Sequence, residues 1–438
     1  MIAFDQLSRA ISAYLPNQRW FGSNGRELQE VSIESVDVLR QQWPLLLAIR
    51  VKALLDDNTS QRYQVLMGLR QSGQTAVFLE GKVEAVMGEF STDLGPAYGY
   101  DALRDPELAL PLFEIAFPDL GVVERVRPVG TEQSNSSLVY DDRFVVKFFR
   151  RLPLGRNLDL EVTKRLQEVG FEPMAEVVGE WTAPEADLAM AQRFLVGGTE
   201  GWQLALTSLR DLLGRGGEPF EAGGDFAGEA ERLGEMTAKL HGALAEAFGV
   251  TAGSADAWAD SMQDQLRTLG HPEVDDEAAA ELFESLRTVP DIGPAIRVHG
   301  DYHLGQVMQT DKGWRVMDFE GEPARSIEDR RLKNSPLKDV AGMLRSFGYA
   351  AASVRADRDK DEVELASSWE ERNRKYFLEG YVASAHEQGG LLPSDTESFD
   401  VILRAFELDK AIYEIGYEIG HRPDWLHIPL QAVRRLLA

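Results

Sequence analysis

Residues 298–320 concentrate polar side chains of the kinds that enzymes use, in the stretch VHGDYHLGQVMQTDKGWRVMDFE. These side chains belong to His299, Asp301, His303, Gln306, Asp318 and Glu320. The apolar residues between them predict two buried strands, and a buried hairpin does not need so many polar neighbours. The spacing is His-Gly-Asp, a Gln five residues after the Asp, and a second Asp twelve residues after the Gln. This pattern indicates a chemical role.

Phosphoryl transfer from ATP is the reaction that fits this spacing. It needs an acceptor hydroxyl held in line, a carboxylate to accept its proton, and cations to neutralise the phosphates. Asp301 is suited to be the catalytic base, and Gln306 and Asp318 offer the hard oxygen ligands that Mg²⁺ prefers. The His-Gly-Asp triplet alone would also fit a capped turn with a satisfied histidine. The second Asp, which follows a predicted strand, makes the pattern more specific.

A lysine that binds the ATP phosphates is expected upstream on a strand, with an acid on the next helix. The segment RFVVKFF places Lys147 among apolar residues, and Glu161 lies in a predicted helix over residues 158–169. An ordinary edge-strand lysine is the alternative for Lys147.

Two further segments are assigned to the nucleotide. The polar turn at residues 131–137 contains Ser134, Asn135 and Ser136, whose donors could cover phosphate oxygens. An ordinary β-turn would look the same. From their order in the chain alone, Gln192 and Phe194 fall in a hinge whose backbone would meet adenine.

Composition narrows the class of protein. The 438 residues include 46 basic and 72 acidic ones, a formal charge of −26, which disfavours nucleic acid and anionic membrane as partners. Cysteine is absent, which excludes disulfides and thiolate chemistry. The start lacks the pattern of a signal peptide, and the apolar run WPLLLAI is far too short to span a bilayer. We therefore expect a cytoplasmic protein that acts on small molecules.

The expected organisation is α+β and bilobal. Residues 1–90 predict a cap subdomain with a helix at 4–14 and strands at 31–38, 44–54, 61–68 and 76–79. Residues 91–198 predict an intermediate N-lobe subdomain rich in strands, although residues 82–117 are expected to be helical and polar. Residues 199–438 predict a mostly helical C-lobe. A hinge near residues 195–203 would place a cleft between the lobes.

Long motifs of the chain resemble the actinobacterial maltokinase family. They include EQSNSSLVY, VVKFFRRLPLGRNLDLEV, HGDYHLGQV, MDFEGEPARSIEDRRLKNSPLKDVAGMLRSF and LDKAIYEIGYE, and QRWFGSNGR is similar to that family's N-terminal cap. The resemblance implies a protein-kinase-like fold of the aminoglycoside phosphotransferase type, with an N-terminal cap and a large helical C-lobe. It also implies an enzyme that uses ATP and Mg²⁺ to phosphorylate a sugar.

Residue roles follow from the same resemblance. It makes Asp301 the catalytic base, and it makes Gln306 and Asp318 the metal ligands, with Glu320 beside them. Lys147 becomes the ATP phosphate ligand with Glu161 as its partner, and His303 is expected to brace the loop.

The C-terminal motif departs from the maltokinase pattern, in which an Ala-Arg pair stands where this chain has Ile419-Gly420. The same segment carries acids at Glu407, Asp409, Glu414 and Glu418, and aromatic residues at Tyr413, Tyr417 and Trp425. Acids with less compensation would favour a cationic sugar, because an ammonium forms charge-assisted hydrogen bonds with carboxylates. A structural helix, whose acids pair with Lys410, Arg404 and Arg422, is the alternative. The predicted sugar contacts are Asp301, His303, Asp409, Tyr413, Glu414 and Trp425.

Three functions are therefore weighed. The first is an ATP-dependent kinase that converts glucosamine to glucosamine 6-phosphate, and this reading resembles the glucosamine kinase branch of the family. The second is a maltokinase that forms maltose 1-phosphate for α-glucan synthesis, with trehalose synthase as a partner. The third is a pseudokinase-like protein that binds without transfer, although degenerate kinases usually lose the lysine, the base or the metal ligand. We expect a monomer.

Overall fold

The computed structural model describes residues 3–22, 26–74, 76–130, 135–220, 225–323, 325–354 and 360–438. The chain divides into two compact units. The first comprises Met1–Glu161 and Ala175–Val196, and the second comprises Val162–Met174 and Gly197–Ala438. Among the described residues, no helix is both long and apolar enough to cross a membrane.

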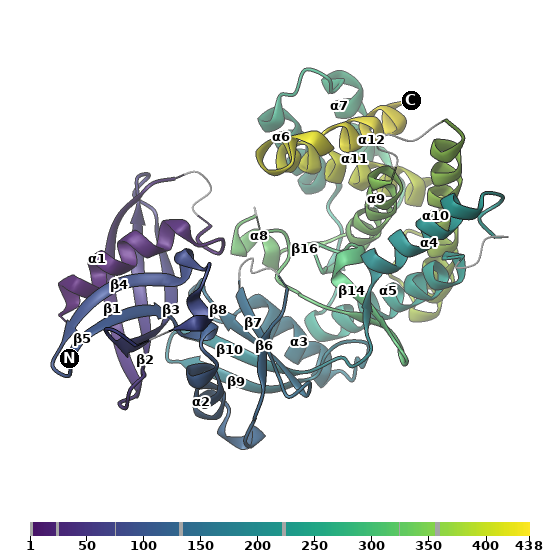
Figure 1. Ribbon diagram of the computed structural model, residues 1–438. Coiled ribbons are helices and arrows are strands. Elements are labelled where there is room, and N and C mark those ends of the chain that lie inside the picture. The colour runs from purple at the N-terminus through teal and green to yellow at the C-terminus, as the bar shows by residue number, and fades with distance from the viewer. Residues whose placement is uncertain are drawn as a thin grey trace. The chain divides into compact units, whose positions relative to one another are not determined.

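An antiparallel sheet with the order β1-β2-β3-β5-β4 forms the first part of the N-terminal unit (Figure 1). Its strands are β1 (Leu28–Arg40), β2 (Leu45–Leu55), β3 (Ser60–Gln71), β4 (Val86–Thr92) and β5 (Gly95–Asp101). Helix α1 (Phe4–Tyr14) buries Leu7, Ile11 and Tyr14 against it. These residues are three or four positions apart and so share one face of the helix. Helix α1 and the first three strands lie where the sequence predicts them.

Residues 82–117 differ from the expected polar helix. They form strands β4 and β5 and only then helix α2 (Pro106–Ala116). The strands bury Met87, Phe90 and Ala97, and a tight turn joins them, in which the Leu94 amide donates to the Thr92 hydroxyl. Residues 76–79, expected as a strand, contain a short 3₁₀ helix instead (Val77–Leu79). The boundary expected at residue 90 falls inside β4.

A second antiparallel sheet, with the order β6-β7-β8-β10-β9, completes the N-terminal unit. Its strands are β6 (Val126–Pro128), β7 (Asn135–Tyr140), β8 (Phe144–Phe149), β9 (Val177–Ala183) and β10 (Ala186–Arg193). The three-residue β7–β8 turn places Asp141 and Asp142 at positive φ, and the Arg143 amide donates to the backbone oxygen of Tyr140 at 2.9 Å. Helix α3 (Leu158–Glu168) follows. Helix α3 lies close to the helix predicted over residues 158–169, and the strands agree with the strand-rich segment that the sequence predicts.

Buried polar groups join the two sheets. Arg150 follows β8 directly, and its fully buried guanidinium pairs with Asp101 at the end of β5. Asp101 also accepts a hydrogen bond from the Tyr14 hydroxyl at 3.1 Å. The Gln64 side chain of β3 donates to the backbone oxygens of Phe149 and Leu188, at 3.1 and 2.9 Å. Strand β8 is therefore fixed to the cap sheet by side chains as well as by backbone.

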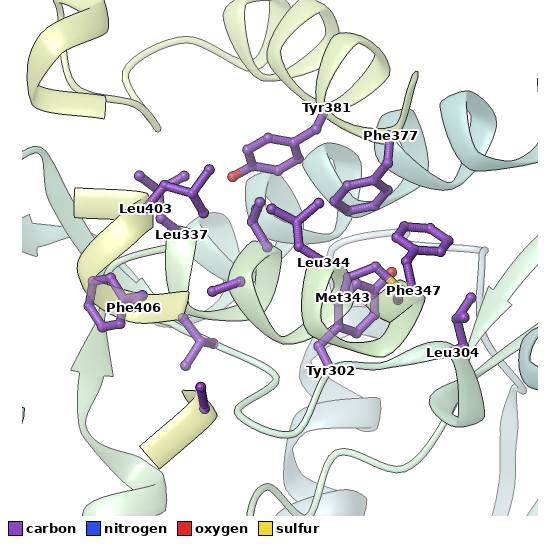
Figure 2. Close-up of a cluster of buried hydrophobic side chains, with 14 of the residues drawn as sticks. Tyr302, Leu304, Leu337, Met343, Leu344, Phe347, Phe377, Tyr381, Leu403 and Phe406 are labelled. Carbon is purple, nitrogen blue, oxygen red and sulfur yellow. The ribbon is translucent and has the colours of Figure 1, made fainter. Parts of the chain in front are cut away.

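Helices dominate the C-terminal unit. They are α4 (Gly201–Arg215), α5 (Ala227–Phe248), α6 (Ala255–Leu269), α7 (Asp276–Ser285), α8 (Ile327–Arg331), α9 (Leu337–Ser353), α10 (Lys360–Gln388), α11 (Thr396–His421) and α12 (His427–Leu437). Helix α9 is buried on all sides, apart from Lys338 and Ser353. Figure 2 shows its residues Met343, Leu344 and Phe347 among side chains from α10 and α11. Because α9 is buried on nearly every face, it lies at the centre of this core, and its buried Asp339 and Arg345 need polar partners.

Short strands hold the polar segment against this helical core. Strand β13 (Pro294–Arg297) lies between β12 (Thr251–Ala252) and β16 (Lys333–Asn334). Strands β14 (Val307–Thr310) and β15 (Gly313–Val316) form the predicted hairpin, which β11 (Thr199–Glu200) extends. The loop between β13 and β14 carries the His-Gly-Asp triplet.

We predict that Asp101→Ala lowers the free energy of unfolding by about 3–5 kcal/mol, because it leaves the Arg150 charge buried without this partner. Urea unfolding, followed by tryptophan fluorescence, measures the change. Glu176→Ala is the matched control, since the Glu176–Arg193 pair is more than half exposed and should contribute at most about 1 kcal/mol. Equal effects of the two substitutions would contradict the structural role of the buried pair.

Candidate active site

The His-Gly-Asp loop is anchored through its backbone. The amides of His299 and Gly300 donate to the two carboxylate oxygens of Asp339, at 2.7 and 2.8 Å. The His299 ring is buried, and its Nε2 lies 3.0 Å from the backbone oxygen of Met317. Gly300 has φ of +89°, a conformation that L side chains rarely adopt. The loop therefore presents the next residue, Asp301, from a fixed backbone.

Asp339 is itself held by a chain of buried groups. His241 Nε2 lies 3.2 Å from the Asp339 carboxylate, and His241 Nδ1 lies 2.9 Å from the Tyr381 hydroxyl. Since a carboxylate only accepts, Nε2 carries the proton and Tyr381 donates to Nδ1. Burial by itself would raise the pKa of Asp339, but His241 and the loop amides outweigh it, so that the pKa lies below its ordinary value. Sequence reasoning missed both residues, although an acid in an apolar helix was a usable signal.

Asp301 faces two donors. Its Oδ1 lies 3.3 Å from Lys410 Nζ, and its Oδ2 lies 3.7 Å from His303 Nε2. Burial alone would raise the pKa of Asp301, but the charge of Lys410 and the hydrogen bond of His303 hold it well below its usual range. His303 Nδ1 accepts the Gly305 amide at 3.0 Å. His303 thus bonds within the loop, which is the arrangement that a bracing residue needs.

The hairpin brings the predicted metal ligands to one end. Val307 pairs with Val316, and the Met317 amide donates to the backbone oxygen of Gln306 at 2.9 Å. Gln306 and Asp318 therefore lie at the open end of the β14–β15 ladder. Carboxylate oxygens of Asp318 and Glu320 lie within 4.8 Å of each other. Two carboxylates and an amide oxygen form the donor set that suits Mg²⁺.

Lys147 and Gln192, two of the residues predicted to bind the nucleotide, have identifiable partners within the N-terminal unit. Lys147 lies in β8 and forms an ion pair with Asp159, a buried residue in the first turn of α3. Sequence reasoning selected Glu161, two residues further along the same helix, and missed Asp159. Gln192 ends the ladder of β10, where its side chain lies 3.3 Å from the backbone oxygen of Ala175.

The role predicted for the polar turn at residues 131–137 is wrong for the side chain of Ser136. Ser136 is buried in β7, and its hydroxyl accepts a hydrogen bond from Arg150 Nε at 2.8 Å. Its side chain therefore belongs to the joint between the two sheets and does not reach solvent to cover a phosphate. Asn135 begins β7, and Ser134 lies outside the described residues. Phe194 lies 5.4 Å below the guanidinium of Arg127.

Three acids of α11 have cationic partners, contrary to the expectation of acids with less compensation, and the Glu418–Arg422 pair is one that the structural alternative named. Glu407 pairs with Arg374 at 2.8 Å, Glu414 with Arg345 at 2.7 Å, and Glu418 with Arg422 at 2.6 Å. Arg404, by contrast, donates to the backbone oxygen of Leu436. Two of the three partners, Arg374 and Arg345, come from other helices, so the C-terminal motif alone does not show them.

The predicted sugar contacts divide into two groups. Asp409 and Tyr413 line a small cavity together with Gly300 of the catalytic loop. Burial raises the pKa of Asp409, whose Oδ1 accepts from Gln265 at 2.7 Å. Trp425 instead stacks on Tyr349, with 6.2 Å between ring centroids. Among the predicted sugar contacts of α11, Asp409 and Tyr413 are therefore the ones that line a cavity with the loop of Asp301.

We predict that Asp339→Asn destabilises the protein by about 3 kcal/mol at neutral pH, because it removes a buried carboxylate that several donors require. The pKa of Asp339 is depressed in the folded state, so its contribution is present above the ordinary pKa of about 4 and is lost as the pH falls below it. Denaturant unfolding at a series of pH values should show the difference from the wild type shrinking below about pH 4. Asp264→Asn, at an exposed ion pair with Arg267, should change stability little at any pH. A pH-independent loss for Asp339→Asn would contradict the assignment.

Comparison with known proteins also indicates a phosphotransferase. Residues 14–105 match the model of the maltokinase N-terminal cap domain, and residues 125–360 match that of the phosphotransferase enzyme family. The chain is 26% identical to a glucosamine kinase of Streptacidiphilus jiangxiensis over 345 residues, 74% of this chain and 76% of the relative. It is also 26% identical to a glucosamine kinase of Mycolicibacterium smegmatis over 327 residues, 71% and 79% of the two chains.

Solved structures show the same fold. A glucosamine kinase in complex with glucosamine, ADP and inorganic phosphate superposes with a TM-score of 0.67 at 21% identity, covering 98% of this chain and 99% of that one. Another crystal form of glucosamine kinase gives a TM-score of 0.69 at 21% identity, with 96% of each chain covered. The match to residues 125–360 spans more than half of the chain, and the protein belongs to the phosphotransferase enzyme family.

Proposed function

We propose that this protein is an ATP-dependent glucosamine kinase, which transfers the γ-phosphoryl group of ATP to glucosamine and forms glucosamine 6-phosphate. The observation that carries the proposal is Asp301 on its anchored loop, with an ionised carboxylate held between two donors. The curated relatives supply the acceptor, since both are glucosamine kinases that align over more than two thirds of this chain.

Asp301 would orient the acceptor hydroxyl and accept its proton as the phosphoryl group leaves ATP. Its depressed pKa keeps the carboxylate ionised at neutral pH, which is the form that a base needs. Phosphoryl transfer demands positioning more than covalent chemistry, because the transition state is loose. A carboxylate fixed through its backbone and through both oxygens meets that demand.

Gln306, Asp318 and Glu320 would hold magnesium at the end of the hairpin. Their oxygen atoms fit that ion, and the carboxylates of Asp318 and Glu320 are close enough to share it. When bound, the ion supplies positive charge that neutralises the phosphates of the nucleotide. Asp318 has φ of +61°, a conformation that is uncommon for a non-glycine residue and frequent at functional sites.

In the N-terminal unit, Lys147 would bind the ATP phosphates. Its ion pair with Asp159 fixes the ammonium beside β8, and the buried Arg150–Asp101 ion pair fixes the strand itself. Glu161 remains a predicted partner, and the backbone of residues 192–195 remains the predicted contact for adenine. Asn135 remains a predicted ligand of the phosphates.

Maltose is the second acceptor to test, because the N-terminal residues match a maltokinase cap. Under that alternative the product is maltose 1-phosphate, and trehalose synthase becomes a partner. The compensated acids of α11 remove one argument for a cationic sugar, so the glucosamine proposal rests on the relatives and on Asp409, which lines the cavity beside the catalytic loop.

We predict that Asp301→Asn lowers turnover by about 10²–10⁴-fold, the range expected for loss of a general base. ADP affinity, measured by calorimetry, should stay unchanged because Asp301 serves the acceptor. Asp311→Asn is the control, since Asp311 is exposed in the turn of the same hairpin. Near-normal turnover by Asp301→Asn would refute the assignment of the base.

Acceptor choice is tested by ADP release from ATP and Mg²⁺ with glucosamine or maltose as the added sugar. We expect turnover with glucosamine and none with maltose, and mass spectrometry of the product should show one added phosphoryl group. Turnover with maltose alone would establish the maltokinase alternative. If neither sugar causes ADP release, the proposal is overturned for both acceptors.

A further inference from the structure

Lys410 has the most constrained charge near the catalytic loop. Its ammonium lies 2.6 Å from Glu322 Oε1, 3.3 Å from Asp301 Oδ1 and 4.7 Å from the centroid of the Tyr413 ring. The side chain is only 15% exposed. A lysine ammonium has three donors, and here two carboxylates and an aromatic face surround it. Sequence analysis named this residue only as a possible structural partner of acids on its own helix.

Glu322, the nearer carboxylate of the ammonium, has a partner of its own. Glu322 is buried, and its second oxygen accepts a hydrogen bond from Arg325 at 2.6 Å. Arg325 in turn donates to Gln265 at 3.2 Å, and Gln265 donates to Asp409, the residue before Lys410, at 2.7 Å. The cavity that adjoins these groups has a volume of only about 10 Å³, room for one water molecule. The cavity therefore leaves little room beside the Lys410 ammonium.

Asp301 is held from the opposite side by His303. Because His303 Nδ1 accepts the Gly305 amide, Nε2 carries the proton and faces Asp301 Oδ2 at 3.7 Å. One donor thus faces each oxygen of the carboxylate. Together with the anchored backbone of the loop, these two donors fix the rotation of the Asp301 side chain.

We propose that Lys410 is a positioning residue, which sets the orientation of the Asp301 carboxylate toward the acceptor hydroxyl from helix α11. The inference rests on the proposed phosphoryl transfer but not on which sugar is the acceptor. A misplacement of about 1 Å can cost about 100-fold in rate, because the reacting atoms must be aligned. Loss of the ammonium would leave Asp301 Oδ1 without this donor and the carboxylate free to rotate.

A double-mutant cycle with Lys410→Met and Asp301→Asn tests the inference. We expect Lys410→Met to lower kcat by about 100-fold, with unchanged KM for ATP and unchanged affinity for ADP. In the Asp301→Asn background the same substitution should have no further effect on residual turnover, because it acts through Asp301. Lys375→Met, at an exposed lysine of α10 with its own ion pair, is the control and should keep wild-type kcat.

Two results would overturn the inference. One is a folded Lys410→Met enzyme with near-normal kcat, and the other is a loss in the Asp301→Asn background equal to that in the wild type. ADP affinity reports whether the Lys410→Met variant folds. If that variant does not fold, Lys410→Gln, which keeps a donor for Glu322, takes its place in the cycle. If the wild type phosphorylates neither sugar, the proposal of these two acceptors is refuted. The same double-mutant cycle is then measured on the slow hydrolysis of ATP, in which water accepts the phosphoryl group.

Discussion

The carboxylate of Asp339 is the group on which the catalytic loop depends. It lies in a helix that is buried along almost its whole length, and it accepts the amides of the two residues before Asp301. A buried charge of this kind costs free energy unless donors surround it. The loop amides and His241 are those donors, so the packing of α9 and the conformation of the loop depend on the same hydrogen bonds.

The charged residues of α11 and its surroundings are arranged differently from Asp339. Acids and bases of α11 and its surroundings form neutral pairs and short networks, with Lys410 between Asp301 and Glu322. A buried charge with a partner keeps its geometry, because any movement exposes two uncompensated groups. The charges of α11 that lie near Asp301 are therefore set by these pairs, and a count of acids in the sequence of the helix does not predict them.

Much of the site could be predicted from sequence because its residues are close in the chain. Asp301, Gln306 and Asp318 belong to one loop and hairpin, in which strand pairing fixes their relation. Lys147 could be predicted because a lysine within an apolar strand is unusual. Partners from distant segments could not be predicted, since spacing says nothing about them. Asp159 was missed in favour of Glu161 on the same helix, and Arg345, Arg374 and Asp339 became visible only through tertiary contacts.

The fold shows the same limit. Alternating apolar residues located β1 to β3, and the three-or-four spacing located α1. Residues 86–101 were missed because their strands carry glycines and single buried side chains such as Phe90, which weaken the period-two signal. Ser136 was misassigned for a related reason. A serine in a polar turn and a serine buried beside an arginine have the same local sequence, and only the distant Arg150 distinguishes them.

The Arg150 joint has a consequence for how this architecture can be changed. Arg150 belongs to the kinase-like strands and Asp101 to the cap sheet, and both are buried together with Tyr14 of the first helix. A cap exchanged between relatives would have to bring a carboxylate to this arginine, or the graft would bury a lone cation. The cap and the strand that carries Lys147 are thus coupled through this buried pair, and an exchange of one without the other has to preserve it.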